Sequence, residues 1–302
     1  MKKALLIVNP DSGKQDGKSL ARRIASAIEG SFESVDCRLS ACADDVRGWA
    51  REARESGVDA LFVMGGDGTA GLALRGLFDG ASEGGSMPAF GIVPGGTGNG
   101  LARTLGLPSD PEQAIAAYDF SATRPLDVGF VDDEPFAYTV TAGTLPEGIR
   151  DVPSEAKSRF GFLAYAASEL LRIGSDERHM LRIVVDGREI VEDVSSFVAF
   201  SANALVNDFT TAHDTRVDSG KMHLIALKSA SVQSLLSILP DVLARSIDEN
   251  DQVLFLHGES IEVSCLDGSL TCGVDGDDGP SLPVRLTVRP GALQMFALRS
   301  DR

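Results

Sequence analysis

Residues 60–69 read Ala-Leu-Phe-Val-Met-Gly-Gly-Asp-Gly-Thr, an apolar run that passes directly into a glycine-rich turn. Two other stretches have the same form: residues 4–8 lead into Asn-Pro-Asp-Ser-Gly, and residues 89–93 lead into Pro-Gly-Gly-Thr-Gly-Asn. Glycine lets backbone N–H groups approach an anion without an intervening Cβ, and a strand–turn–helix unit aims the helix N-terminus at the same point. Together the three turns predict one phosphate-binding rim.

Apolar runs alternate with helix-like segments over residues 1–122, the pattern of a βαβ fold with a mostly parallel sheet. The predicted strands are 4–8, 35–39, 60–64 and 89–93, and the predicted helices are 18–28, 44–55, 69–78 and 100–105. All three glycine turns then fall at the carboxyl ends of strands, the edge where open α/β sheets bind ligands. We therefore expect an N-terminal α/β domain over residues 1–122.

From about residue 123 the pattern changes to alternating apolar and polar residues, which is typical of an antiparallel sheet or sandwich. The predicted strands are 126–131, 135–141, 181–185, 196–201, 222–227, 253–256, 261–265, 284–288 and 293–298. Helix-like segments interrupt these strands at 154–173 and 232–247. The wide apolar face of the first segment suits either core packing or an apolar substrate groove. Residues 123–302 are expected to form a β-rich domain.

Composition excludes several functional classes. The 302 residues are 43% hydrophobic and carry a net charge of −16, which argues against binding nucleic acid because a phosphate backbone needs a concentrated basic face. No apolar run approaches the roughly 18 residues of a spanning helix. Cys37, Cys42, Cys265 and Cys272 lack the C-x-x-C spacing of a zinc site. We expect idle or buried thiols and a reducing cytoplasm.

Two nucleotide-binding patterns are incomplete here. Gly66, Gly68 and Gly71 spell the dinucleotide fingerprint, but the next strand ends in Ile-Val-Pro rather than in the acidic residue that holds a ribose. Residues 13–19 nearly spell a P-loop, with one residue missing between the glycines. The phosphate-binding rim is therefore of another type.

Asp67 stands among the glycines of the second turn, where a phosphate would repel it unless a cation or a proton transfer involves it. Its position suggests Mg²⁺ chelation or base catalysis, with helix capping or turn stabilisation as the alternative. Thr69 and Thr97 suit either capping or a phosphate contact. Residues 272–279, Cys-Gly-Val-Asp-Gly-Asp-Asp-Gly, place three carboxylates together, and a solvated hairpin loop is their ordinary explanation.

In the order and spacing of these segments, the chain resembles the catalytic domain of the diacylglycerol kinase family, which includes sphingosine and ceramide kinases and bacterial lipid kinases. The resemblance extends from Lys3 to Leu298 and is carried by residues 9–13, 65–69, 94–103 and 274–293. It implies an N-terminal domain with the nucleotide site and a C-terminal β-rich domain that supplies the lipid cleft.

The resemblance also implies roles for individual residues. Asp67 would act on Mg²⁺ or on the acceptor hydroxyl. Asp277 stands where the family usually has the Glu of Asp-Gly-Glu, the proton acceptor, and Asp275 opens the same motif as a further catalytic candidate. Carboxylates facing each other across the cleft, Asp67 and Asp277, would suit phosphoryl transfer to a hydroxyl. The residues expected to contact ATP are Asn9, Pro10, Ser12, Gly13, Ser40, Gly65, Gly66, Asp67, Gly68, Thr69, Gly96, Thr97 and Asn99.

The chain departs from the family pattern at three places. Gly100 replaces an acidic residue that many relatives carry. Residues 218–222 read Asp-Ser-Gly-Lys-Met where bacterial relatives hold a structural Mg²⁺ with Asp-Asp-Gly-x-Leu, which leaves Asp218 as the metal candidate of that segment. Residues 144–149, Thr-Leu-Pro-Glu-Gly-Ile, replace a glycine-rich stretch of the relatives.

These features predict an ATP- and Mg²⁺-dependent kinase that phosphorylates a hydroxyl of a diacylglycerol-like or sphingoid-like lipid. The expected location is cytoplasmic and peripheral to a membrane. The expected partner is the lipid, with no nucleic acid, and a homodimer remains open. Two alternatives stand beside this prediction: an NAD kinase-like or other small-molecule kinase, and a catalytically inactive relative that binds a nucleotide or a lipid.

Overall fold

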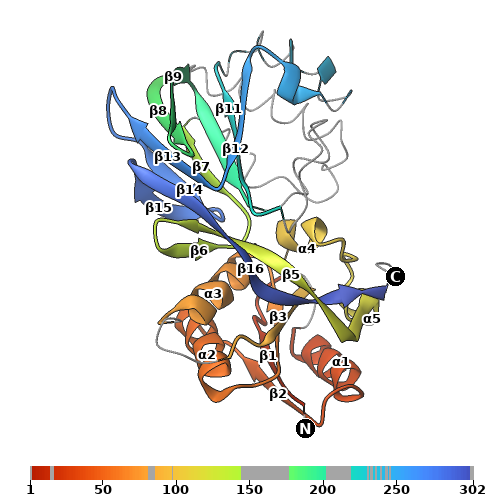
Figure 1. The fold of residues 1–302 in the computed structure, drawn as a ribbon. Helices are drawn as coiled ribbons and strands as arrows, with labels where there is room; N and C mark the ends of the chain where they lie inside the picture. Colours follow the sequence, from red (N-terminus) through yellow and green to blue (C-terminus); the bar gives the residue numbers. More distant parts are fainter. Residues whose placement is uncertain are drawn as a thin grey trace. The chain divides into compact units, whose positions relative to one another are not determined.

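The structure, a computed structural model, describes residues 2–13, 17–80, 86–96, 98–143, 177–201, 219–229 and 246–299, with single positions between 231 and 244. The chain divides into two compact units, whose elements are labelled in Figure 1. Unit 1 comprises Met1–Val128, Glu134–Ala137 and Pro290–Arg302, and unit 2 comprises Gly129–Asp133 and Tyr138–Arg289.

Unit 1 is built on four parallel strands. Their order is β2 (Ser34–Leu39), β1 (Lys3–Val8), β3 (Ala60–Gly65) and β4 (Ala89–Pro94). Strands β1, β3 and β4 are buried almost throughout, as expected for a parallel sheet whose two faces are covered by helices. Each strand lies within one residue of its predicted bounds.

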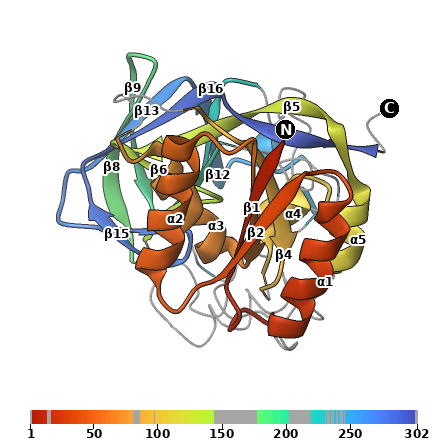
Figure 2. The same ribbon diagram turned by 90° about the horizontal axis from the view of Figure 1, so that it is seen from below.

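Helices cover both faces of this sheet. Figure 2 shows α1 (Gly17–Glu29) and α5 (Pro111–Ala117) on one side of the parallel strands, and α2 (Ala43–Ser56) and α3 (Asp67–Phe78) on the other. The short helix α4 (Gly100–Thr104) follows the third glycine turn. Helix α5 is absent from the predicted elements, although Asp110 caps it and a proline takes its first position, a start signal that the sequence carries.

A buried tyrosine anchors β4 to the strand that leaves the unit, β5 (Tyr118–Val131). The Tyr118 hydroxyl accepts a hydrogen bond from the Ile92 N–H at 2.8 Å and donates one to the Ile92 carbonyl at 2.9 Å. Burial raises the pKa of this hydroxyl, so it stays protonated and keeps its donor role. Beside it Phe62 and Phe296 stack at 5.3 Å between ring centroids, which joins β3 to the carboxyl-terminal part of β16 (Val284–Leu298).

Unit 2 is an antiparallel β-sandwich, which confirms the predicted fold class. One sheet contains the amino-terminal part of β16, then β13 (Ser260–Cys265), β8 (His179–Val185) and β9 (Arg188–Val194). The other sheet has the order β12 (Val253–Gly258), β11 (Met222–Leu227), β10 (Ser196–Phe200), β7 (Val140–Gly143), β14 (Thr271–Val274) and β15 (Asp277–Ser281).

Several predicted elements of this half are wrong in detail. The strand expected over 135–141 is two strands, β6 (Glu134–Phe136) and β7, because the chain between them turns to meet the β14–β15 hairpin. The strands expected at 284–288 and 293–298 are one strand, β16. The helix expected over 154–173 lies outside the described residues, and that over 232–247 is described only at single positions.

Candidate active site

The three glycine-rich turns meet at the carboxyl ends of β1, β3 and β4. The Gly95 N–H donates a 2.8 Å hydrogen bond to the Gly65 carbonyl, which joins the second turn to the third. A Cβ added to Gly96 would lie 2.6 Å from the Gly66 Cα, and one added to Gly13 would lie 2.3 Å from the Gly95 carbonyl oxygen. The backbones approach this closely because no side chains stand between them. We call this group of three turns, residues 9–13, 65–69 and 94–99, the glycine rim.

Polar side chains hold the rim together. The Asn9 side-chain amide donates to Thr69 Oγ1 at 3.1 Å, and the Asn9 N–H donates to the Met64 carbonyl at 2.9 Å, so the first turn is fastened to the second. Ser12 Oγ donates to the Asn9 carbonyl at 2.8 Å. In the third turn the Asn99 side chain exchanges two hydrogen bonds with the Gly96 backbone, at 2.9 and 2.7 Å. These hydrogen bonds fix the conformation of the three turns without a bound ligand.

Asp67 is the first residue of α3, and its half-buried carboxylate faces the start of α4. Oδ2 accepts the Gly100 N–H at 2.9 Å, and Oδ1 accepts the Leu101 N–H at 3.0 Å. The carboxylate therefore caps the amino-terminal end of α4, and Gly100 supplies one of the two donors. Each carboxylate oxygen has a further lone pair, which leaves room for a cation.

Three other predicted ligand residues lie in the rim or beside it. Ser40 follows β2 and is 7% exposed; its N–H and its Oγ both donate to the Val8 carbonyl, at 2.8 and 3.2 Å. The Pro10 carbonyl packs against the start of α1, where a Cβ on Gly17 would lie 2.5 Å from it. Gly68 is exposed in the first turn of α3, and an added Cβ there meets no described atom within 4 Å. Thr97 and Asp218 lie outside the described residues.

The acidic segment of unit 2 is a tight hairpin. Strands β14 and β15 are joined by Asp275 and Gly276, whose φ angles of 56° and 98° are those of a type I′ turn. Asp275 Oδ1 accepts the N–H groups of Tyr138 and Thr139 at 2.7 and 3.1 Å, and this fastens the hairpin to the segment before β7. Asp277 is exposed at the start of β15, and no described residue forms a hydrogen bond or ion pair with its carboxylate.

The structure thus groups the predicted residues by unit. The rim residues and Asp67 come together in unit 1, whereas Asp275 and Asp277 belong to unit 2. The two predicted acids of the hairpin differ: the Asp275 carboxylate is hydrogen-bonded and holds the turn, whereas Asp277 is exposed to solvent. The expectation that Asp67 and Asp277 face each other stays a prediction.

Sequence reasoning missed two features of the rim. Gly95 is missing from the expected ATP contacts, although its backbone meets both other turns: its N–H donates to the Gly65 carbonyl, and its own carbonyl faces Gly13. Its place beside Gly96 in a glycine run is the signal that could have identified it. The backbone donors of Gly100 and Leu101 to Asp67 carry no sequence signal, because they lie 33 and 34 positions from the acceptor and depend on where β4 delivers the chain.

Gly13→Ala is expected to lower the free energy of unfolding by about 2–4 kcal/mol. Its φ of 89° strains any residue with a Cβ, and the added methyl group would meet the Gly95 carbonyl, which is backbone and cannot turn aside. Urea unfolding measures the loss. The matched control is Gly48→Ala within α2, where an added Cβ has open space; it should gain about 0.5–1 kcal/mol. A Gly13→Ala protein as stable as the wild type would mean that the turns do not approach as described.

Comparisons with known proteins agree with this arrangement. Residues 3–131 match the family model of the diacylglycerol kinase catalytic domain, and residues 141–297 match that of the YegS C-terminal NAD kinase beta sandwich-like domain. A Streptococcus pneumoniae protein named "Putative lipid kinase" is 31% identical over 98% of both chains. The diacylglycerol kinase of Bacillus subtilis is 27% identical, over 94% of this chain and 92% of its own length.

Solved structures show the same fold. The crystal structure of a diacylglycerol kinase from Bacillus anthracis aligns with a TM-score of 0.75 at 19% identity, covering 99% of this chain and 98% of that one. Among the helices that the structure describes, none has the length and apolar character needed to span a bilayer. From its two matched domains and its end-to-end relatives, the chain belongs to the diacylglycerol kinase catalytic domain family of lipid kinases.

Proposed function

We propose that this protein is an ATP- and Mg²⁺-dependent kinase that transfers a phosphoryl group to a hydroxyl of a diacylglycerol-like or sphingoid-like lipid. The observation that carries the proposal is the convergence of three glycine turns around Asp67 in unit 1. Phosphoryl transfer depends on positioning and charge neutralisation more than on covalent chemistry, and a rim of backbone donors beside a carboxylate suits both needs.

The rim fits a chain of phosphates. Helix α3 is 12 residues long and begins at Asp67, so the N–H groups of its first turn have no acceptor within the helix and its dipole favours an anion there. A side chain at Gly13 or Gly96 would collide with the neighbouring turn, whereas the space over Gly68 is open. Asn9 and Thr69 are hydrogen-bonded to each other and add polar side-chain atoms to the rim.

Asp67 suits Mg²⁺, which prefers hard oxygen ligands. Its two carboxylate oxygens are held by the α4 amides in one orientation, so a cation would meet a pre-set ligand. Asp67 would hold the Mg²⁺, and the ion would supply neutralisation of the charge that develops on the phosphates. Asp67 then has two roles: its carboxylate fixes the start of α4 and holds the cation. The hydrogen bonds from the Gly100 and Leu101 N–H groups support both roles, because they orient the carboxylate.

Asp277 is proposed as the proton acceptor. Its carboxylate is exposed and engaged by none of the described residues, so it can receive a hydrogen bond from the lipid hydroxyl and take the proton as the new P–O bond forms. Asp275 is a positioning residue, since its carboxylate is occupied by the Tyr138 and Thr139 N–H groups. The side chain of Asp277 is one methylene shorter than the Glu usual in the family.

The test is a phosphoryl-transfer assay with purified protein, labelled ATP and Mg²⁺. Diacylglycerol, ceramide and sphingosine would each be presented in mixed vesicles, with NAD as a water-soluble acceptor. We expect label in one of the lipids and a loss of transfer when a chelator removes Mg²⁺. Formation of NADP would favour the NAD kinase-like alternative, and ATP binding without transfer to any acceptor would favour an inactive relative.

A further inference from the structure

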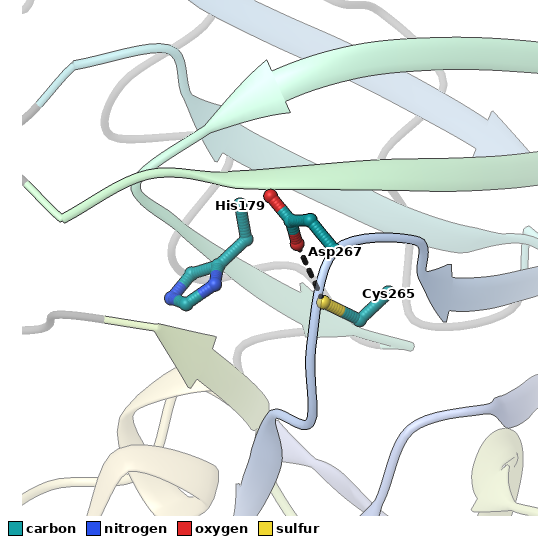
Figure 3. A group of neighbouring side chains, drawn as sticks. All are labelled: His179, Cys265 and Asp267. Atoms are coloured by element: carbon teal, nitrogen blue, oxygen red, sulfur yellow. Dashed lines mark hydrogen bonds between the residues drawn. The ribbon is translucent and has the colours of Figure 1, made fainter.

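Three side chains with different donor atoms gather in unit 2, and the proposed reaction uses none of them. His179 begins β8, Cys265 ends β13, and Asp267 follows in the turn after β13. One ligand atom of each lies within 4.8 Å of those of the other two, and Figure 3 shows the three side chains gathered in one place. We propose that they form a site for a zinc-class transition-metal ion with three protein ligands and one open position.

The backbone holds these residues in place without a metal. Strands β8 and β13 pair in antiparallel register, with Cys265 opposite Leu181. The next residue, Leu266, donates its N–H to the Met180 carbonyl at 2.8 Å, and Asp267 Oδ2 accepts the Met180 N–H at 2.8 Å. Both sides of the cluster are therefore fastened to one another, which lowers the ordering cost of binding an ion.

The donor set selects the kind of ion. Imidazole nitrogen, thiolate sulfur and carboxylate oxygen are the ligands of zinc sites, whereas Mg²⁺ requires oxygen ligands. A thiolate and a carboxylate together balance the two charges of the ion, and a neutral imidazole adds none. Cys265 and His179 are half-buried and Asp267 is exposed, so an ion can enter from solvent and keep a water molecule at the fourth position.

The existing hydrogen bond shows how the proton would leave. Cys265 Sγ donates to Asp267 Oδ1 at 3.1 Å, the contact drawn as a dashed line in Figure 3. On binding, the S–H bond breaks, its proton passes to solvent and a sulfur–metal bond forms. Asp267 Oδ1 then turns from the thiol proton to the ion, while Oδ2 keeps the Met180 N–H and orients the carboxylate.

A bound ion would link positions far apart in the chain. Asp267 lies 87 residues from Met180, its hydrogen-bond partner beside His179, and the ion would add covalent-like bonds between the same two segments. Because an ion that binds only the folded state stabilises it, zinc should raise the melting temperature of the protein. This effect concerns unit 2 alone and needs no phosphoryl transfer to be seen.

The experiment uses the full-length protein, freed of metal with a chelator and titrated with Co²⁺ as a coloured substitute for Zn²⁺. We expect one equivalent to bind, with a thiolate-to-cobalt absorption band that Zn²⁺ abolishes by displacement. Cys265→Ser should remove the band, and His179→Gln should weaken binding at least about tenfold. The matched controls are Cys37→Ser and His257→Gln, which change an exposed thiol and an exposed imidazole and should leave the band intact.

Melting curves without metal verify that each variant is folded. With Zn²⁺ the melting temperature should rise in the wild type and both controls, and not in Cys265→Ser. The proposal is overturned if no cobalt band forms, if the band survives Cys265→Ser, or if Cys37→Ser removes it. None of these results depends on the acceptor lipid, so the site and the proposed kinase activity stand or fall separately.

Discussion

Asp67→Asn is expected to lower the turnover number for phosphoryl transfer by about 10²- to 10⁴-fold. The amide is the same size as the carboxylate but has no charge with which to hold Mg²⁺. It also has a single acceptor oxygen, whereas the carboxylate accepts both the Gly100 and the Leu101 N–H. Its NH₂ group would face one of these donors, so we expect a loss of stability of about 1–3 kcal/mol.

Two measurements separate the contributions of Asp67. Initial rates at saturating ATP give the turnover number, and urea unfolding gives the stability. Asp110→Asn is the matched control, because Asp110 accepts two backbone N–H groups at the start of α5 through one oxygen, Oδ1, which the amide retains. It should change neither quantity appreciably. If Asp67→Asn lost stability and kept its turnover, Asp67 would serve only to cap α4.

Asp277→Asn is expected to lower the turnover number by about 10²- to 10⁴-fold through the loss of the proton acceptor. Unlike Asp67, this residue is exposed and its carboxylate forms no hydrogen bond or ion pair with the described residues, so its replacement should leave the melting temperature unchanged. ATP affinity should also stay at its wild-type value, because the residue is assigned to the acceptor hydroxyl. Initial rates, calorimetric titration with ATP and a melting curve test the three parts.

The hairpin offers its own controls for Asp277. Asp278→Asn neutralises the adjacent exposed carboxylate and should retain wild-type turnover. Asp275→Ala removes the acceptor of the Tyr138 and Thr139 N–H groups and should lower both stability and turnover. Equal losses in Asp277→Asn and Asp278→Asn would point to the net charge of the hairpin, and near-wild-type turnover in Asp277→Asn would move the role of base to another residue.

Prediction from sequence was most accurate for the parallel strands of unit 1. Strands β1, β3 and β4 are short apolar runs, each followed by a turn sequence, and a strand buried on both faces needs that composition whatever its neighbours are. The glycine turns could also be predicted from the sequence, because glycine is the residue that allows two backbones to approach closely. Which residues approach one another across the rim, such as Gly13 and Gly95, is decided by the tertiary structure.

Prediction was weaker where an element is short or polar. The Asp-Gly turn indicates the hairpin that β14 and β15 form, but β15 contains two aspartates, a glycine and a proline, so the sequence does not predict that segment as a strand. The break between β6 and β7 depends on Asp275, which lies 137 residues from Tyr138. Such a contact leaves no periodicity in the local sequence.

The cysteines illustrate the same limit. Their spacing predicts idle or buried thiols; Cys272 is buried, and Cys37 and Cys42 are exposed. Cys265 differs because β13 pairs with β8 and places it beside His179, a neighbour that no short motif could indicate. A search for ligands at fixed spacing finds sites built on one turn or helix and misses those assembled across a sheet.

The amino-acid sequence alone determined the parallel strands of unit 1 and the composition of the rim, because local burial and backbone freedom constrain residue types directly. Tertiary structure decided which N–H groups donate to Asp67, which aspartate of the hairpin accepts hydrogen bonds, and which thiol lies beside a histidine and a carboxylate. Those outcomes depend on strand register and on contacts between distant segments. Many sequences have the same local pattern, and only the folded chain determines which distant residues come into contact.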